Sequence, residues 1–399
     1  MKILHTADWH LGVRTDDLDR FEEQKNALRQ IIDIANKNQV DMVLVAGDVY
    51  DSAIPSSEAE KVFYNTLVEL SRGGDCAVVV IAGNHDDPKR LSNANIFSDK
   101  FNIYLVGYID EIYISNVNSD RNIYAYECGT GYIKFRKRDG EEAVVACLPY
   151  PSYYRYHESP KEGVELRDRI AEWLSYGTSH FEDGKVNMIL AHLTTVGDNL
   201  NPENMPSYKQ VKSLIDANLP YEKYPSAQYV ALGHIHQYLQ VNKAGNMFYS
   251  GSLINQFFNE GDQPTSVIIA DVNSDGVQDI KREFLDVKLL QKFTVESVEE
   301  AENVLKHLRD FLLKIEIRNV DYVDIEDVRR LRREYKNLVT LSIITKEGQK
   351  DYDIESKKDY TFGQVWDAFV AKKEIEKDDK VKELFLELMH EDIFNEDDK

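Results

Sequence analysis

Five short groups of aspartate, asparagine and histidine side chains each follow a short apolar run in this chain. The runs are 3–4, 42–46, 78–82, 188–191 and 229–232. Short apolar runs are typical of buried strands, and open α/β sheets bind ligands at the carboxyl ends of their strands. We therefore expect these side chains to meet at one edge of a sheet. The groups are Asp8 with His10, Asp48, Asn84 with His85 and Asp86, His192, and His234 with His236.

Each group taken alone has an ordinary explanation. Gly47-Asp48 could be a simple turn, because glycine tolerates a positive φ and aspartate bonds its own backbone. Asn84 could likewise be a turn residue in the left-handed region, and His192 and His234 could be core histidines. Chance turns, however, have no reason to put a carboxylate or an imidazole after every strand. The conjunction therefore favours a cage for cations.

The types of side chain constrain which cations fit. Imidazoles with carboxylates and an amide oxygen suit Mn²⁺, Fe²⁺ or Zn²⁺, whereas Mg²⁺ prefers oxygen ligands and water. Seven candidates are too many for one ion with open positions but suffice for two ions that share a carboxylate. Two ions ~3.5–4 Å apart can clamp a phosphoryl group, so phosphoester hydrolysis is the expected reaction. The seven are Asp8, His10, Asp48, Asn84, His192, His234 and His236.

Length and composition indicate a globular protein of more than one domain. The chain has 399 residues, of which 42% are hydrophobic, enough for a substantial core. Cys76, Cys128 and Cys147 are far apart, which argues against a disulfide framework or a structural zinc site. No secretory signal is recognised, and no run approaches the roughly 20 apolar residues of a membrane span. We expect a cytoplasmic protein.

The net charge of −22 is opposite to the basic field expected of a protein that binds DNA by itself. Some acids belong to the expected metal site and others to the last fifty residues. Two basic runs remain, at 134–138 and 329–333. A solvated face is the better interpretation of the first, and the second could equally be a phosphate contact. Weak DNA binding, strengthened by a partner, follows from this composition.

The elements that position the site alternate between strand-like and helical patterns. Residues 107–140 alternate polar with apolar, which predicts antiparallel strands with turns at 118–120 and 138–140. Residues 199–225 are punctuated by proline and asparagine and predict a surface loop with one short helix. Helical spacing is found at 21–38 and 56–71, and further strands are expected at 144–148, 186–191, 228–232 and 266–272.

A second unit is expected at 290–347. It would contain strands at 293–296 and 338–344 and a short helix at 327–335 that carries the second basic run. Apolar residues spaced by three and four predict an amphipathic helix before it. They are Ala301, Val304, Leu305, Leu308, Phe311, Leu312 and Ile315.

The tail, 352–399, predicts two short amphipathic helices, the first with a capping box of Thr361 and Gln364. Their apolar stripes need cover. They could pack back on the second unit, or they could dock on a partner protein. The residues that would bind the partner are Phe362, Trp366, Phe369, Leu384, Phe385 and Leu388.

The five groups together resemble the calcineurin-like metallophosphoesterases, whose pattern is Asp-x-His, Gly-Asp, Gly-Asn-His-Asp, His and Gly-His-x-His. Residues 1–12, 47–51 and 251–253 more closely resemble the SbcD family of bacterial nuclease subunits. The resemblance covers about the first 285 residues well. It implies an α/β fold in which a two-sheet sandwich is flanked by helices over 1–285. A small α+β cap domain at 290–347 and a C-terminal helical tail at 352–399 would follow.

The resemblance also implies how the ligands divide. One ion would be held by Asp8, His10 and His236, the other by Asn84, His192 and His234, and Asp48 would bridge the two.

Three further residues surround these ligands in the motif. His85 would face the scissile phosphate and act on the transition state or the leaving oxygen, although it could also be an imidazole without a chemical role. Asp86 would fix the loop or a histidine tautomer. Asp51 stands where archaeal and eukaryotic relatives carry a second active-site histidine, so the role of that histidine is not transferred. We group Asp51 with Asp86 as a support for the ligands.

The family's activity gives the functional expectation. It implies a Mn²⁺-dependent nuclease with exonuclease activity at duplex ends and endonuclease activity on single strands or hairpins, serving DNA repair, recombination and replication. Two copies would join two copies of the ATPase SbcC, and the tail would bind the base of the SbcC coiled coil. The alternatives are an enzyme for small phosphoesters and a DNA-end tether with a weak nuclease site.

Overall fold

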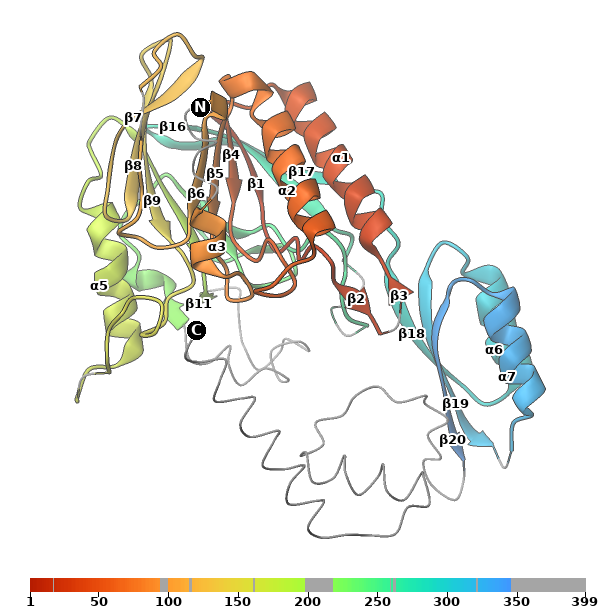
Figure 1. The fold of residues 1–399 in the computed structure, drawn as a ribbon. Helices are drawn as coiled ribbons and strands as arrows, with labels where there is room; N and C mark the ends of the chain where they lie inside the picture. Colours follow the sequence, from red (N-terminus) through yellow and green to blue (C-terminus); the bar gives the residue numbers. More distant parts are fainter. Residues whose placement is uncertain are drawn as a thin grey trace, which may run out of the picture.

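Two sheets lie face to face between layers of helices (Figure 1). The computed structural model describes residues 1–16, 18–93, 100–114, 117–160, 162–197, 218–258, 260, 263–320 and 322–345. Within these residues the first sheet has the order β17-β16-β1-β4-β5-β6, and the second has the order β14-β15-β13-β10-β9-β8-β7. This is the α/β two-sheet sandwich expected from the resemblance.

The strands of the first sheet are β1 (Lys2–Thr6), β4 (Met42–Val45), β5 (Ala77–Ile81), β6 (Ile103–Val106), β16 (Ser266–Asn273) and β17 (Gly276–Phe284). Those of the second are β7 (Ile123–Gly129), β8 (Tyr132–Lys137), β9 (Glu142–Leu148), β10 (Val186–His192), β13 (Tyr229–Gly233), β14 (Leu239–Gln240) and β15 (Met247–Tyr249). Short strands β2 (Arg14–Thr15), β3 (Leu18–Asp19), β11 (Thr194–Val196) and β12 (Asn218–Pro220) lie in the loops.

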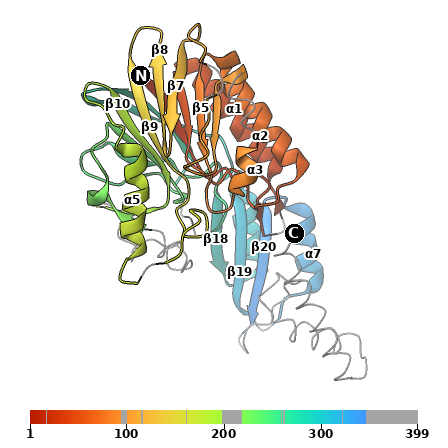
Figure 2. The same ribbon diagram turned by 60° about the vertical axis from the view of Figure 1, so that its left-hand side comes forward.

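Three long helices cover the outer faces of the sheets. Helices α1 (Phe21–Asn38) and α2 (Ser57–Leu70) cover the first sheet, and α5 (Leu166–Thr178) covers the second, as Figure 2 shows. Each helix turns an apolar stripe inward; Trp173 of α5 and Phe63 of α2 are almost fully buried. A third apolar layer fills the space between the sheets and includes Met188 and Phe248. Short helices α3 (Pro88–Ser92), η1 (Arg72–Gly74) and η5 (Tyr221–Lys223) complete this part.

The parallel pairing determines where the site forms. Strand β1 runs parallel to β4 and β4 to β5, whereas in the other sheet β9, β10 and β13 run parallel. The carboxyl ends of these strands therefore lie on one side of the sandwich, where ligand sites form in such sheets. His5 of β1 reaches across to β13, where its Nε2 lies 3.1 Å from the Leu232 carbonyl oxygen. Burial lowers the pKa of His5 to about 3.

A separate three-stranded parallel sheet follows, with β18 (Leu290–Val295), β19 (Leu312–Val320) and β20 (Leu338–Thr345) in that order. Helices α6 (Val298–His307) and α7 (Ile325–Glu334) cover one of its faces (Figure 1). We call these elements the three-stranded unit. It touches the sandwich where the Thr340 hydroxyl donates to the Asp16 carboxylate, and Lys314 lies beside both Asp16 and the Phe258 ring.

The sequence prediction for this unit was wrong in one respect. The helix expected to continue through Ile315 ends at His307, and Leu312–Val320 is a strand. The physical reason is a second periodicity in the same residues. Leu313, Ile315 and Ile317 alternate at spacing two, are fully buried, and lie on a strand that is paired on both sides. Two neighbouring strands satisfy this backbone, so the strand pattern prevails over the helical one.

The antiparallel strands predicted within 107–140 are present, with one difference in the turns. Strands β7, β8 and β9 are antiparallel as expected, and the turn at 138–140 is present. The sharper turn at Thr130-Gly131, between β7 and β8, was not foreseen. Most of the expected loop at 199–225 and all of the tail at 352–399 lie outside the described residues.

None of the helices in the described part of the chain has both the length and the apolar character needed to cross a bilayer.

Candidate metal centre

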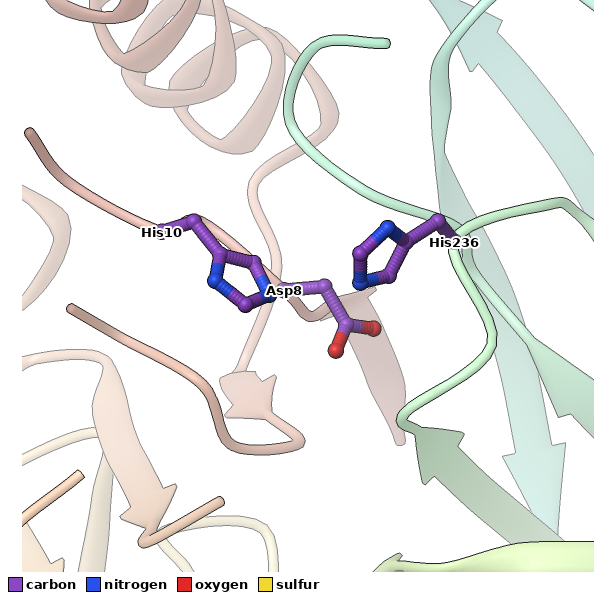
Figure 3. Close-up of side chains that lie close together, drawn as sticks. All are labelled: Asp8, His10 and His236. Carbon is purple, nitrogen blue, oxygen red and sulfur yellow. The ribbon is translucent and has the colours of Figure 1, made fainter. Parts of the chain in front are cut away.

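The first group of converging side chains is Asp8, His10 and His236. Asp8 and His10 lie in the turn after β1, and His236 lies in the turn after β13, in the other sheet. One ligand atom from each lies within 4.8 Å of the others. Figure 3 shows the two imidazole rings on either side of the Asp8 carboxylate. Asp8 and His10 are buried, whereas the His236 side chain is 20% exposed.

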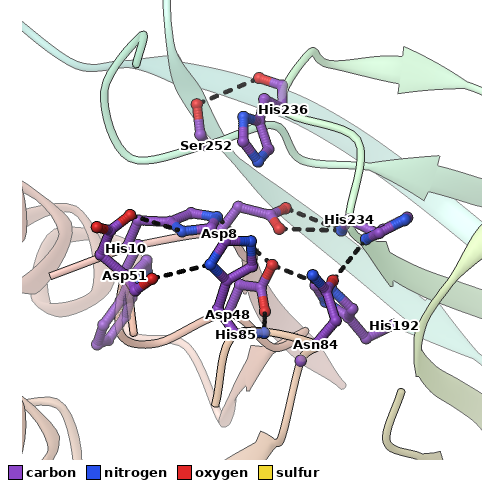
Figure 4. Close-up of polar contacts among 12 residues, drawn as sticks. Asp8, His10, Asp48, Asp51, Asn84, His85, His192, His234, His236 and Ser252 are labelled. Atoms are coloured by element: carbon purple, nitrogen blue, oxygen red, sulfur yellow. Dashed lines mark hydrogen bonds and ion pairs between the residues drawn. The ribbon is translucent and has the colours of Figure 1, made fainter. Parts of the chain in front are cut away.

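The second group is Asn84, His192 and His234. The Asn84 Oδ1 atom lies 3.1 Å from His192 Nε2 and 2.8 Å from His234 Nδ1. His192 is the last residue of β10, Asn84 follows β5, and His234 follows β13 (Figure 4). The group therefore also takes residues from both sheets.

The Asp48 carboxylate lies between the two groups. Its Oδ2 atom is 3.5 Å from His10 Nε2 and 3.3 Å from His192 Nε2. Its Oδ1 atom accepts a hydrogen bond of 2.8 Å from the backbone N–H of His85. One oxygen thus faces both groups while the other is fixed by the backbone. This arrangement would suit a carboxylate that is shared by two ions.

Two glycines allow the two sheets to approach this closely. A Cβ atom on Gly233 would lie 1.8 Å from the Ala46 carbonyl oxygen, and one on Gly47 would lie 2.4 Å from His192 Nδ1. Gly47 also has a φ of +86°, a value that other residues rarely adopt. The same Ala46 carbonyl accepts a 2.7 Å hydrogen bond from His192 Nδ1. The glycines of the Gly-Asp and Gly-His motifs are therefore needed to join the sheets at the site.

The side chains at this point fit divalent cations. Both ring nitrogens of His10 and the Nε2 atom of His234 are buried and have no hydrogen-bond partner in the described part of the chain. Buried polar atoms without a partner are costly, and an imidazole nitrogen is a good ligand for borderline divalent metals. The carboxylates of Asp8 and Asp48 add the negative charge that would hold two such ions.

Protons compete with cations for these groups. Burial lowers the pKa of His192, but the charge and hydrogen bond of Asp48 outweigh it and raise the pKa to about 9. His236 behaves similarly, because its hydrogen bond to Glu260 raises its pKa to about 9 against the effect of burial. Burial and the neighbouring His192 hold the pKa of His234 well below its usual value. Because a metal ligand must be deprotonated, binding of cations by these histidines would release protons.

Asp86 and Asp51 contact the loops and side chains of the candidate ligands. The Asp86 carboxylate accepts hydrogen bonds from the backbone N–H groups of Val49, Tyr50 and Gly83, at 2.8–3.1 Å. It thereby ties the loop after β4 to the loop after β5. The Asp51 carboxylate lies 3.6 Å from His10 Nδ1.

His85 is exposed and lies at the open side of the site. Its Nδ1 atom lies 2.8 Å from the Asp51 carbonyl oxygen. A carbonyl oxygen can only accept, so Nδ1 carries the proton and Nε2 is the nitrogen available to a substrate. The ring lies edge-on to His10, with 4.7 Å between the centroids.

Sequence reasoning missed three residues that hold the site together. Gln24 of α1 donates from Nε2 to the carbonyl oxygens of Trp9 and His10, at 2.9 Å and 2.8 Å. The sequence could have indicated Gln24, because it is a polar residue at a position on the buried apolar stripe of α1. Arg155 and Glu260 lie in irregular segments, where no periodicity distinguishes them.

Arg155 clamps the loop that carries Asn84 and His85. Its guanidinium donates to the carbonyl oxygens of Gly83, Asn84 and Asp86, at 2.5, 3.0 and 2.7 Å. It also lies over the Tyr150 ring, 5.6 Å from the centroid. A single planar cation thus satisfies three backbone carbonyls of one loop, a task that lysine cannot reproduce.

We expect Arg155→Ala to reduce Mn²⁺-dependent hydrolysis of a small phosphodiester by at least about 10-fold, the lower end of what supporting residues contribute at metal sites. The loss should appear because the Asn84 loop is no longer held. Arg136→Ala is the matched control, since Arg136 pairs with Glu142 on the surface of β8. Initial rates of both variants against wild type check the expectation. A rate for Arg155→Ala equal to that of the control would contradict it.

Comparison with known proteins agrees with this geometry. A family model described as calcineurin-like phosphoesterase matches residues 1–238, which include all seven candidate ligands. The chain is 30% identical to the SbcD component of the nuclease SbcCD from Bacillus subtilis (strain 168), over 97% of each chain. It is 24% identical to the protein of the same name from Staphylococcus epidermidis, over 90% of each chain. The corresponding protein of Escherichia coli K12 is 29% identical over 65% of this chain and 62% of that one.

Proposed function

Because the chain belongs to the calcineurin-like phosphoesterase family, and within it to the SbcD nucleases, we propose that it cuts DNA with two divalent ions at the site between the sheets. Membership makes the chain a metal-dependent hydrolase. The finer proposal is exonuclease activity at duplex ends and endonuclease activity on single strands or hairpins. The observation that carries the two-ion proposal is the Asp48 Oδ2 atom, 3.5 Å and 3.3 Å from a histidine nitrogen of each group.

We propose that Asp8, His10 and His236 hold one ion and Asn84, His192 and His234 the other, with Asp48 between them. Mn²⁺ is the proposed ion, because this mixture of imidazole, carboxylate and amide suits it better than Mg²⁺. When bound, the two ions supply charge neutralisation of the phosphate and a lowered pKa of water. The protein holds the ligands in fixed positions and leaves one side of the site open.

His85 has the proposed task of moving a proton. Its Nδ1–H is engaged by the Asp51 carbonyl, so Nε2 would point to the phosphate. A protonated Nε2 would donate to the leaving oxygen as its bond to phosphorus breaks. Histidine is the side chain that most often performs such proton transfers.

Side-by-side turnover tests the substrate class. With Mn²⁺ the chain should cut linear DNA and also hydrolyse a small phosphodiester such as bis(p-nitrophenyl) phosphate. Hydrolysis of the small ester without cutting of DNA, even with the partner present, would favour an enzyme for small phosphoesters. DNA binding without turnover of either substrate would favour a tether. Both results would overturn the nuclease proposal.

The surface charge supports a partner for DNA binding. The basic side chains of both runs largely form ion pairs with acidic side chains. Lys134 pairs with Glu127 and Glu182, and Arg330 pairs with Glu302 and Asp327. With a net charge of −22 as well, the chain alone would bind DNA weakly. The related proteins are named as subunits of SbcCD. We propose that this chain likewise acts as a homodimer with two SbcC ATPase subunits in DNA repair and recombination.

We also propose a separate function for each of three parts of the chain. Residues 1–285 would form the catalytic domain and 290–347 a cap that helps to seat DNA. Residues 352–399, outside the described residues, would form the tail that binds SbcC. Phe369 and Leu388, each on one apolar stripe of the tail, are the residues to test.

Changing Phe369 and Leu388 together to aspartate should abolish co-purification with SbcC, because two charges would enter an apolar interface. Hydrolysis of a small phosphodiester should remain at the wild-type rate, since the metal ligands lie in another part of the chain. Pull-down of the co-expressed proteins and a thermal melt of the free chain check this. If SbcC binding persisted while the melting temperature fell, the stripes would pack internally and the proposal would be wrong.

A further inference from the structure

Glu260 is a buried carboxylate directed at one member of the proposed ligand set. The residue is 2% exposed. Its Oε1 atom lies 2.7 Å from His236 Nδ1, and its Oε2 atom accepts a 2.6 Å hydrogen bond from the backbone N–H of Gln256. The Gln237 side chain donates to the Glu260 carbonyl oxygen. Both carboxylate oxygens therefore have a partner, and one of those partners is His236.

This contact determines which nitrogen of His236 is available to a cation. With Nδ1 donating to Glu260, Nε2 is the nitrogen left for a cation, which would replace any proton there, and it faces the Asp8 carboxylate and His10 (Figure 3). A carboxylate at the outer nitrogen fixes the tautomer and ring orientation and makes the imidazole a stronger ligand.

The preceding segment, 251–258, is itself held against the site. The backbone N–H of Leu253 donates to the Asp8 carbonyl oxygen at 3.3 Å, and that of Ser252 donates to the His236 carbonyl oxygen at 3.0 Å. The Thr15 hydroxyl donates to the Gln256 carbonyl oxygen at 3.0 Å. The segment that donates to the Glu260 carboxylate through the Gln256 N–H is therefore fixed to the backbone of two proposed ligands.

In the Asn84 group, His192 has a neutral partner at the corresponding nitrogen. His192 Nδ1 donates to the carbonyl oxygen of Ala46. His234 Nδ1 faces the Asn84 amide oxygen, itself a proposed ligand, and His234 Nε2 has no hydrogen-bond partner in the described part of the chain. The Asp8 group, by contrast, has the carboxylates of Asp8 and Glu260 in addition to the shared Asp48. The negative charge around the cage is therefore concentrated at the Asp8 group.

From this asymmetry we propose that Glu260 is a positioning residue that makes the Asp8–His10–His236 site the tighter of the two cation sites, so that the ions load in two steps. The inference rests on the proposed two-metal function and deepens it. The chain takes one ion firmly at the Asp8 group. The second ion, at the Asn84 group, exchanges more readily, and its occupancy follows the free concentration of the metal.

Titration of the full-length, metal-free chain with Mn²⁺ tests the proposal, with bound and free ion followed by electron paramagnetic resonance. Wild type should give two resolved affinities. Glu260→Gln keeps the size of the side chain and an acceptor for Gln256, but it loses the charge. We expect the tighter affinity to fall roughly 10–100-fold and the weaker one to stay unchanged. Glu222→Gln, an exposed change on η5, should leave both affinities as in wild type.

A second variant separates positioning from a structural role. In a His236→Ala background, Glu260→Gln should cause no further loss of Mn²⁺ affinity, because the side chain on which it acts is gone. Equal weakening of both steps, or a further loss in that background, would overturn the proposal. So would unchanged affinities in Glu260→Gln. The outcome is independent of DNA cleavage: a wild type that binds two ions in two steps but cuts no DNA would contradict only the proposed function.

Discussion

Asp48→Ala is expected to abolish phosphodiester cleavage, lowering kcat/KM by at least about 10³-fold, the upper range for loss of one electrostatic group in an active site. The reason is that one oxygen of Asp48 serves both ligand groups, at 3.5 Å from His10 Nε2 and 3.3 Å from His192 Nε2. Its loss should therefore weaken both cation sites together, whereas loss of an outer ligand such as His234 should weaken one.

Mn²⁺ binding and hydrolysis, measured on the same samples, check this expectation. Asp183→Ala, an exposed change in the turn before β10, is the matched control and should resemble wild type. A thermal melt establishes that the Asp48 variant is folded. Mn²⁺-dependent cleavage at the wild-type rate by folded Asp48→Ala would show that the two-metal assignment is mistaken.

His85→Gln is expected to separate chemistry from metal binding. The variant should keep both ions but lose at least about 10²-fold in kcat, the contribution typical of a positioned acid or base. Glutamine can still donate a hydrogen bond to the Asp51 carbonyl, but it cannot transfer a proton at the position of Nε2. The effect should therefore fall on the rate of the chemical step, with little change in the affinity for Mn²⁺.

Metal content by mass spectrometry decides between the two roles of His85. Two ions per chain, together with slow turnover of a small phosphodiester, are the expected result. His307→Gln serves as control, because His307 is an exposed histidine of α6 in the three-stranded unit. Loss of one ion from His85→Gln would instead make His85 a ligand.

Convergence of the strand-end side chains could be predicted from sequence because it depends on local patterns. A buried parallel strand is apolar throughout, so the first polar residue after it marks the carboxyl end. The structure brings the seven candidate ligands together from β1, β4, β5, β10 and β13 in this way. Their roles remain proposals. The partners behind them could not be predicted, because Arg155 lies 71 residues from Asn84, and Glu260 lies 24 residues from His236.

The error at β19 has a different physical cause. Ile315 fits both the helical spacing that begins at Ala301 and the spacing of two that it shares with Leu313 and Ile317. Only pairing with β18 and β20 selects the strand. Local sequence contains no information on whether neighbouring strands are available. Regions with a single periodicity, such as α1, were predicted with the bounds that the structure has.

The division of the site between two sheets has a mechanical consequence. Asp8, Asp48 and Asn84 are carried by one sheet, and His192, His234 and His236 by the other, so the distance across the cage equals the offset between two independently hydrogen-bonded layers. A cation held by ligands from both sheets would require that offset to be correct to within about 0.2 Å, the tolerance of metal–ligand distances. A substitution among the apolar residues between the sheets, such as Met188 or Phe248, can therefore lower the rate of hydrolysis. It would do so by changing the offset between the sheets, without altering a ligand or a residue that contacts the substrate.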